Sequence, residues 1–331
     1  MTAPTPGRGR RPPVALLALS IIAMLASSAC GSDGSTSSSP SGPSLASGER
    51  IKVVATTTVL ADLVRNAGGD RVVVESLVPA GAEPHTFAPR PSDLRKIVDA
   101  DVVVMNGLGL DDWLRPLAAE AKRPDAALVE LGRDLTGVTY LAEGAEGAGA
   151  APAVAAPGET ANPHLWLNVA YAEKYVDRIA DALVAARPAE ADAIRASAAA
   201  YRTTLSDLDA SIRQRLGALP EDHRRVVSFH DAFPYYAAAY GLDIVGVVTP
   251  VPGQEPSASE VVALVDAIRA AGATAIFAEA QFSPKVADQI AAETGAKVVA
   301  TLYNDSLGEP PADSYVGMMQ WDTDRVVEAL R

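Results

Sequence analysis

The amino-acid sequence predicts an α/β protein of two lobes, each with a roughly four-stranded parallel sheet flanked by helices. Short apolar runs rich in β-branched residues alternate along the chain with stretches of helical periodicity, and these runs fall into two groups of four. The runs are continuously apolar, as expected for strands that are covered on both faces. Strands interleaved with helices favour parallel pairing, so each group predicts one sheet.

The first group of strands predicts an N-terminal lobe over residues 49–163. Its apolar runs include "IKVVATT" and "DVVVMNG". The four predicted strands span 51–57, 71–78, 101–107 and 126–131. Helical periodicity fills the gaps at 58–67, 91–99 and 111–121. We expect Ser92 to cap the second of these helices, because a Ser side chain can accept a hydrogen bond from a free N–H in the first turn.

The second group of strands predicts a C-terminal lobe over residues 188–331. Its runs include "RVVSF" and "ATAIFAE". The four predicted strands span 225–229, 243–248, 273–279 and 296–301. Helical stretches at 231–240, 257–271 and 283–293 lie between and after them. The second lobe therefore repeats the strand and helix alternation of the first.

A stretch of unusual composition and a long helical stretch separate the two groups. Residues 143–161 are rich in Ala, Gly and Pro and are predicted to form a mobile surface loop of the N-terminal lobe. Helical periodicity then covers 165–186 and 189–216, with a break at Pro188. The first of these helices would be about 33 Å long, roughly the width of a small domain. We therefore expect one rigid connector helix at 164–187.

The N-terminal stretch has the features of a bacterial lipoprotein signal. Basic residues without acids precede the apolar run "VALLALSIIAMLASSA", and Cys30, the only cysteine of the sequence, follows directly. This pattern predicts a signal peptide at 1–29, a lipid anchor on Cys30 and a flexible Gly- and Ser-rich linker at 30–48. The protein is then expected outside the cytoplasm, on the outer face of the cell membrane. An uncleaved anchor helix with an incidental thiol is the alternative.

The composition narrows the classes of partner. The formal net charge is −13 over 331 residues, which argues against nucleic acid, because phosphate binding requires a basic face. No apolar run after residue 30 is long enough to span a bilayer. The sequence therefore predicts a folded body that reaches the membrane only through its anchor.

Several polar side chains fall where ligands bind in open α/β sheets, beyond the carboxyl ends of strands, or just before the connector helix. They are His85, His164, His230, Glu279 and Asp305. Three imidazoles and a carboxylate suit a divalent transition ion such as Zn²⁺, and the lack of a usable thiol disfavours Cu(I). Pro84 and Pro163 each precede a histidine and stiffen its position. None of the histidines has a tight signature such as H-E-x-x-H, so hydrogen-bonded histidines without a ligand role remain the alternative.

At these residues the chain resembles the zinc- and manganese-binding solute-binding lipoproteins of ABC importers (cluster A-I). The matching stretches include "EPHTFAPRPSDL", "NPHLWLN", "VSFHDAFPYYAAAYGL", "FAEAQFSPK" and "LYNDSLG", with "SYVGMMQWDTDRVVEAL" at the end. The resemblance implies two α/β lobes joined by a long backbone helix, with the metal in the cleft between them. It implies the metal ligands His85, His164, His230 and Asp305. It leaves Glu279, Asp231 and Glu83 as residues that support the ligands.

The resemblance also frames the choice of ion. Relatives that resemble manganese binders often have Glu where His230 stands. Three imidazoles favour Zn²⁺ instead. Mn²⁺ is the alternative, because a three-His, one-Asp site in this family can hold either ion. Many zinc-uptake relatives carry a His-rich loop before the second ligand, whereas 143–161 contains no histidine. The zinc prediction therefore depends on the four ligands alone.

The expected function is capture of the ion and its delivery to an ABC transporter membrane permease, by a monomer that is not an enzyme. Two other classes remain open. A zinc metallohydrolase would use the same cluster with Glu279 as its base. A metal-stabilised surface adhesin would lose its fold when the ion is removed.

Overall fold

The computed structural model describes residues 49–144, 153–249, 256–280 and 285–331. The predicted signal peptide, Cys30 and the predicted linker lie outside these ranges, as do residues 145–152 of the predicted loop. None of the helices in the described ranges combines the length and the apolar character that crossing a bilayer requires. Residues 47–331 form one compact unit, so the boundaries at 163/164 and 187/188 stay a prediction.

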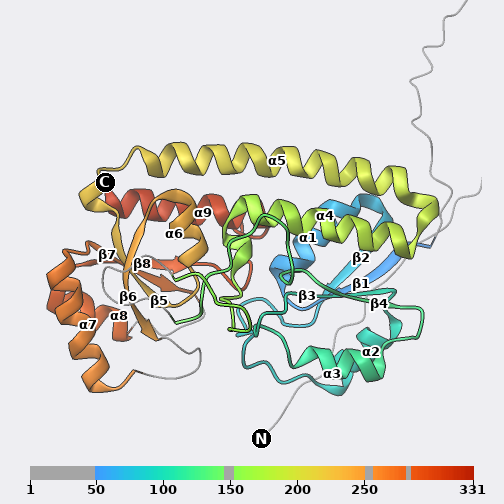
Figure 1. Cartoon of the computed structure of the whole chain (residues 1–331), viewed down its shortest axis with the longest axis horizontal. Coiled ribbons are helices and arrows are strands. Elements are labelled where there is room, and N and C mark those ends of the chain that lie inside the picture. Colours follow the sequence, from blue (N-terminus) through green and yellow to red (C-terminus); the bar gives the residue numbers. More distant parts are fainter. Residues whose placement is uncertain (1–48, 145–152, 250–255, 281–284) are drawn as a thin grey trace, which may run out of the picture. The chain divides into compact units, whose positions relative to one another are not determined.

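The N-terminal sheet contains four parallel strands in the order β2-β1-β3-β4 (Figure 1). The strands are β1 (Ile51–Ala55), β2 (Val72–Ser76), β3 (Val102–Met105) and β4 (Ala127–Glu130). Side chains such as Val53 pack with α1 (Thr58–Gly68) on one face. Val54 and Val103 pack with α2 (Pro91–Asp99) and α3 (Leu114–Ala121) on the other. Helices on both faces explain why these strands are almost wholly apolar.

The C-terminal sheet repeats this plan with the order β6-β5-β7-β8, again all parallel. Its strands are β5 (Arg225–His230), β6 (Asp243–Thr249), β7 (Ala275–Glu279) and β8 (Lys297–Leu302). Its helices are α6 (Pro234–Tyr240), α7 (Ala258–Ala271), α8 (Lys285–Thr294) and α9 (Tyr315–Leu330). α6 and α9 cover one face, whereas α7 and α8 cover the other. The predicted fold class, two parallel α/β sheets with a long connecting helix, is confirmed.

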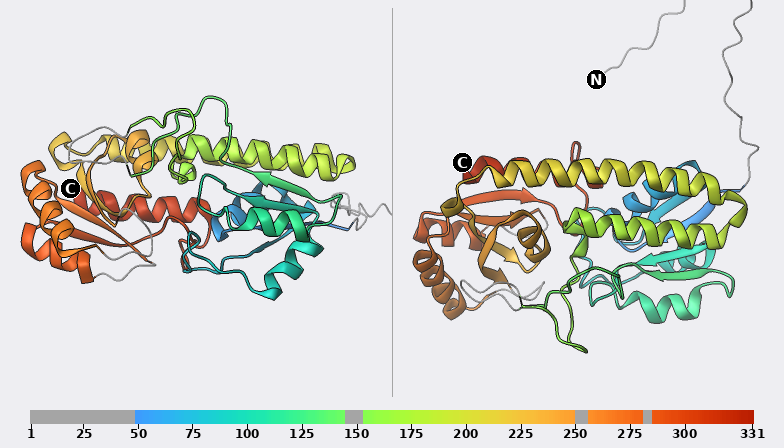
Figure 2. Two further views of the ribbon diagram at one scale, coloured as in Figure 1. Left: turned by 60° about the horizontal axis from the view of Figure 1, so that its bottom comes forward. Right: turned by 45° about the horizontal axis from the view of Figure 1, so that its top comes forward.

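The connector differs from the prediction. The stretch expected to be one helix at 164–187 is a 3₁₀ turn, η2 (Leu165–Leu167), followed by α4 (Val169–Ala186), whose N-cap Asn168 accepts a hydrogen bond from Ala170 N. α4 packs on α1, β3 and β4 of the N-terminal lobe. The longer helix α5 (Ala191–Gly217) contacts both lobes, because it packs on α1 and also on α6 and α9 (Figures 1 and 2). The start of α4 also reaches the C-terminal lobe, where Val169 N donates to Tyr240 Oη and Tyr171 packs on Tyr235.

The start of α2 also corrects the prediction. Its N-cap is Arg90 rather than Ser92, and Pro91 is the first helical residue. Proline suits that position because its φ is already helical and its missing N–H needs no partner there. The Asp93 carboxylate accepts a hydrogen bond from Arg90 N at 2.8 Å, so the helix begins two residues earlier than a Ser cap would allow.

The two lobes share contacts beyond α5. Leu307 N donates to Thr58 Oγ1 at 2.8 Å, and Tyr315 N donates to Asp62 Oδ2 at 2.9 Å. One continuous apolar cluster includes residues of α1, α4, α5, α6 and α9. These contacts place the carboxyl-end loops of both sheets against each other.

Candidate metal centre

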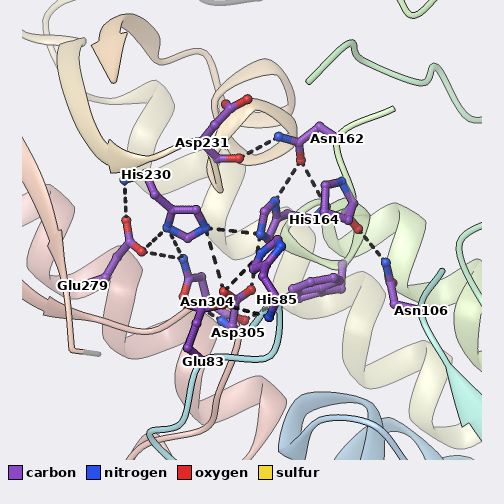
Figure 3. Close-up of polar contacts among 12 residues, drawn as sticks. Glu83, His85, Asn106, Asn162, His164, His230, Asp231, Glu279, Asn304 and Asp305 are labelled. Atoms are coloured by element: carbon purple, nitrogen blue, oxygen red, sulfur yellow. Dashed lines mark hydrogen bonds and ion pairs between the residues drawn. The ribbon is translucent and has the colours of Figure 1, made fainter. Parts of the chain in front are cut away.

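The structure brings the four predicted ligands into one buried cluster (Figure 3). One comes from the loop after β2, one from the end of β5, one from the loop after β8 and one from the segment just before η2. One ligand atom from each lies within 4.8 Å of the others: His85, His164, His230 and Asp305. Because the strands are parallel within each sheet, the carboxyl ends of β2, β5 and β8 bring His85, His230 and Asp305 to the facing edges of the two sheets, and His164 joins them from the segment before η2.

The distances in the cluster suit a small ion. His164 Nε2 lies 3.3 Å from both Asp305 Oδ1 and His230 Nε2. Asp305 Oδ2 lies 3.8 Å from His85 Nε2 and 3.8 Å from His230 Nε2. A tetrahedral ion with bonds of about 2.0–2.1 Å keeps its ligand atoms about 3.3–3.4 Å apart. The cluster can therefore hold such an ion with small movements.

His164 is held with its Nε2 facing the other ligands. Asn162 Oδ1 accepts from His164 N at 3.1 Å and lies 2.9 Å from His164 Nδ1. The backbone N–H identifies this amide atom as oxygen, so Nδ1 must carry the ring proton. In the neutral ring Nε2 is then an unprotonated nitrogen, as a metal ligand must be. The Trp166 indole packs against the same ring, with 5.3 Å between ring centroids.

His230 is held in the same orientation by a carboxylate. Glu279 Oε2 contacts His230 Nδ1, and Glu279 Oε1 accepts from His230 N at 3.1 Å. Asn304 Nδ2 also donates to Glu279, at 2.9 Å. Burial lowers the pKa of His230, but the Glu279 carboxylate raises it more, and the result is a pKa of about 9.

The Pro-rich loop that carries His85 is held by an aromatic pair. Trp113 Nε1 donates to Pro84 O at 3.0 Å, and the Phe87 ring packs on Trp113. Burial lowers the pKa of His85 to about 3, although Asp305 opposes this shift. His85 is therefore a neutral imidazole at physiological pH, and its side chain is the most exposed of the four, at 13%.

Asp305 is a buried carboxylate with no hydrogen-bond donor on either oxygen within the part of the chain that the structure describes. Burial raises the pKa of Asp305, but the neighbouring imidazoles of His164, His85 and His230 lower it more, so the net shift is downward. A buried carboxylate is costly unless a cation or donors compensate it. Both oxygens face the three imidazoles, where an ion would supply that compensation.

The three predicted supporting residues lie around the cluster in different ways. Glu279 contacts His230 directly. Glu83 Oε1 accepts from His85 N at 2.9 Å, and burial, together with the charge of Asp305, raises the pKa of Glu83 to about 7. Asp231 lies on the His164 side of the cluster, where its backbone oxygen accepts a hydrogen bond from Asn162 Nδ2 at 2.6 Å. Their support of a bound ion stays a prediction.

Two asparagines of the site were not predicted. Asn162 orients His164, and Asn304 joins Glu279 to Asp305 by donating to the first and accepting from the backbone N–H of the second at 2.6 Å. Both stand within two residues of a proposed ligand. That proximity was the available signal, but an amide has no metal-ligand pattern of its own.

Known proteins match the sequence over most of its length. The sequence matches the family described as ZnuA, zinc-uptake complex component A, periplasmic, over residues 53–329. The manganese-binding lipoprotein MntA of Halalkalibacterium halodurans is 30% identical over 285 residues, 86% of this chain and 89% of the relative. The iron-binding protein YfeA of Yersinia pestis is 32% identical over 287 residues, 86% of this chain and 88% of the relative.

Solved structures support the fold. The periplasmic zinc binding protein TroA from Treponema pallidum superposes with a TM-score of 0.75 at 24% identity, covering 85% of this chain and 99% of that one. A Mn-bound periplasmic metal binding protein from Candidatus Liberibacter asiaticus superposes with a TM-score of 0.74 at 23% identity, covering 85% and 100%. With the match over residues 53–329, these findings show that the chain belongs to the ZnuA family of periplasmic metal-binding proteins.

Proposed function

We propose that the protein captures a divalent transition metal ion outside the cytoplasm and delivers it to the membrane permease of an ABC importer. One observation carries the proposal: a buried carboxylate without hydrogen-bond donors among the described residues faces three imidazole nitrogens. Such a cluster is costly when empty of positive charge and favourable around an ion. The proposed ligands are His85, His164, His230 and Asp305.

Zn²⁺ is the ion that this ligand set favours. Three nitrogens and one carboxylate match the preferences of Zn²⁺, and two of the distances equal the edge of a tetrahedral zinc site. Mn²⁺ is the alternative, because it prefers oxygen ligands and higher coordination, which Asp305 could supply with both oxygens. The names of relatives point to manganese, iron and zinc, so the choice depends on this site.

Capture joins the two lobes through the ion. His85 and His164 come from segments before α4, whereas His230 and Asp305 follow strands of the C-terminal sheet. The cavity beside β2, of about 580 Å³, and the one beside residues 155–161, of about 690 Å³, include none of the four ligands. The ion must therefore reach a buried cluster, and the partly exposed His85 is the side on which entry needs the least movement.

The choice of ion is tested by competition. Protein purified without added metal is assayed for metal content and then titrated with Zn²⁺ against Mn²⁺. Zn²⁺ should win, and replacing His230 by Glu should raise the Mn²⁺ to Zn²⁺ affinity ratio. Because a glutamate there would face Glu279, the double variant with Glu279→Gln controls for repulsion between carboxylates. An unchanged ratio in both variants would count against the proposed ligand set.

Delivery requires a permease and an anchor. Relatives named as ABC transporter substrate-binding lipoproteins support transport rather than hydrolysis. We propose that Cys30 carries the lipid and that the linker at 30–48 tethers a monomer to the outer face of the cell membrane. An intracellular ATPase then drives uptake through the permease. Replacing Cys30 by Ser should release the protein into the soluble fraction while metal binding is retained. Continued membrane association of that variant would favour an uncleaved anchor helix instead.

A further inference from the structure

The Asn162 side chain contacts a ligand residue of one lobe and the backbone beside a ligand of the other. It is fully buried. Its Oδ1 accepts from His164 N and lies 2.9 Å from His164 Nδ1, whereas its Nδ2 donates to the carbonyl of Asp231 at 2.6 Å. Asp231 directly follows His230. Figure 3 shows the amide between the His164 ring and the Asp231 backbone.

The two ends of the amide cannot exchange roles. A backbone N–H fixes one end as oxygen, and a backbone carbonyl fixes the other as NH₂. The backbone of Asn162 is held as well, because its N–H donates to Leu141 O at 2.8 Å and its carbonyl accepts from Tyr235 Oη at 3.0 Å. The side chain is therefore a short link of defined direction between the two lobes.

We propose that Asn162 is a positioning residue that sets the spacing of the His164 and His230 nitrogens across the lobes. This inference rests on the proposal that both histidines bind the ion. The two Nε2 atoms lie 3.3 Å apart, and the Asn162 amide connects His164 to the backbone carbonyl of Asp231, the residue next to His230, by three hydrogen bonds. A shift of the Asp231 backbone relative to His164 would change the spacing of the ligands that an ion must bridge.

Tyr235 offers a matched control. Its hydroxyl bonds the Asn162 carbonyl and accepts from Leu141 N at 3.0 Å. Replacing Tyr235 by Phe thus removes contacts between the same segments without touching the amide side chain or either ring. A role of Asn162 limited to folding would make Tyr235→Phe and Asn162 variants behave alike.

Two Asn162 variants separate the bonds to His164 from the bond to Asp231. Asn162→Ala removes all three. Asn162→Asp keeps an acceptor for His164 but places an oxygen against the Asp231 carbonyl oxygen, which breaks the link between lobes by repulsion. Asn162→Asp is also nearly the same size as the native residue, so it serves if the alanine variant does not fold.

The experiment uses Co²⁺ as the probe, because its visible ligand-field bands report ligand geometry directly. We expect Asn162→Ala to weaken Co²⁺ binding about 10–100-fold. Both Asn162 variants should shift the bands, whereas Tyr235→Phe should keep the native bands and affinity. Far-UV circular dichroism of each metal-free variant confirms that it is folded.

The outcomes distinguish this inference from the proposed function. If native protein fails to bind Co²⁺, or if His164→Ala binds it with unchanged bands, the proposed ligand set is wrong and the inference falls with it. If the native protein binds through His164 but Asn162→Asp keeps the native affinity and bands, the link to Asp231 does not set the ligand spacing. Equal band shifts in Tyr235→Phe and Asn162→Asp would likewise overturn the positioning role.

Discussion

His230 lies between an acceptor at each of its ring nitrogens. Nδ1 contacts Glu279 Oε2, and Nε2 lies 3.3 Å from His164 Nε2. With a pKa raised to about 9, His230 is an imidazolium at neutral pH and can donate to both neighbours. Its Nε2 proton then occupies the position of the ion, so binding must displace that proton.

This displacement predicts a pH dependence of metal affinity. Below pH 9 each ion should release about one proton from His230, so affinity should rise up to tenfold per pH unit between pH 7 and 9. His85, whose pKa is lowered to about 3, adds no competition in this range. Isothermal titration in buffers of different ionisation enthalpy measures the released protons.

Glu279→Gln is the control for this prediction. Removing the carboxylate charge lowers the His230 pKa, so the pH dependence of affinity should move to lower pH, while the amide oxygen can still accept from Nδ1. An affinity that is flat from pH 7 to 9 in the native protein would contradict the assignment of a charged His230.

The same pKa shift predicts how the stability of the metal-free protein depends on pH. The pKa of His230 is higher in the folded state, about 9, than the 6.5 of an ordinary histidine. The stabilisation is therefore complete below pH 6.5 and is lost as the pH rises through 9. Denaturant unfolding should show a loss of about 3 kcal/mol over this window. If the His230→Gln variant shows no such loss of stability, His230 is the group responsible.

The sequence predicted the candidate ligands in two steps: position near strand ends and the connector helix marked three histidines and two acids, and the family resemblance then implied which four bind the ion. The residues that orient them could not be predicted in this way. Asn162 donates to the Asp231 carbonyl and Asn304 donates to the Glu279 carboxylate, and these partners meet only when segments far apart in the chain pack together. Glu279 was predicted as a supporting residue because it ends a strand, but its pairing with His230 required the parallel register of β5 and β7.

At the scale of elements, α9 is held at its start by a residue of the other lobe. Asp62, on α1, accepts from Tyr315 N and from Asn66 Nδ2 at 3.1 Å. The first N–H groups of a helix have no partner within the helix, and a carboxylate there also favours the helix dipole. Ser314 supplies a second cap by accepting from Gly317 N.

Replacing Asp62 by Ala should therefore destabilise the protein by about 1–3 kcal/mol, because it leaves a buried N–H without a partner. Ser257→Ala, at the exposed N-cap of α7, is the matched control and should cost about 1 kcal/mol or less. The denaturant midpoint of each variant gives its loss of stability, provided that the dependence of the free energy of unfolding on denaturant concentration is unchanged. A smaller loss for Asp62→Ala than for Ser257→Ala would show that the cap between lobes adds nothing.

The eight strands were predictable because an unbroken apolar run of four to eight residues is a strong local signal for a strand that is buried on both faces. The differences arise where local signals compete. Asn168 caps α4 and breaks the helix expected from residue 165, and Pro91 outweighs Ser92 at the start of α2. α5 begins after the break at Pro188 and contacts both lobes. Helical periodicity predicts that such a helix forms, but it does not predict which elements the helix packs against.

At the scale of the whole molecule, the apolar core does not depend on the ion. One cluster includes residues of both sheets and of α1, α4, α5, α6 and α9, and none of the four proposed ligands belongs to it. Thr58 and Asp62 also join the lobes, because they accept hydrogen bonds from Leu307 N and Tyr315 N. A chain of this size buries enough apolar surface to fold without a metal.

We therefore expect chelation to leave the fold intact, as a protein that must release its cargo requires. Far-UV circular dichroism should not change with EDTA, whereas free Zn²⁺ at about 100 times the dissociation constant should add about 2.7 kcal/mol of stability. For a unit of this size that corresponds to a rise in Tm of about 4–5 °C. Asp305→Asn should abolish the rise while keeping the metal-free spectrum. Unfolding on chelation would instead identify the ion as structural, as in a metal-stabilised adhesin.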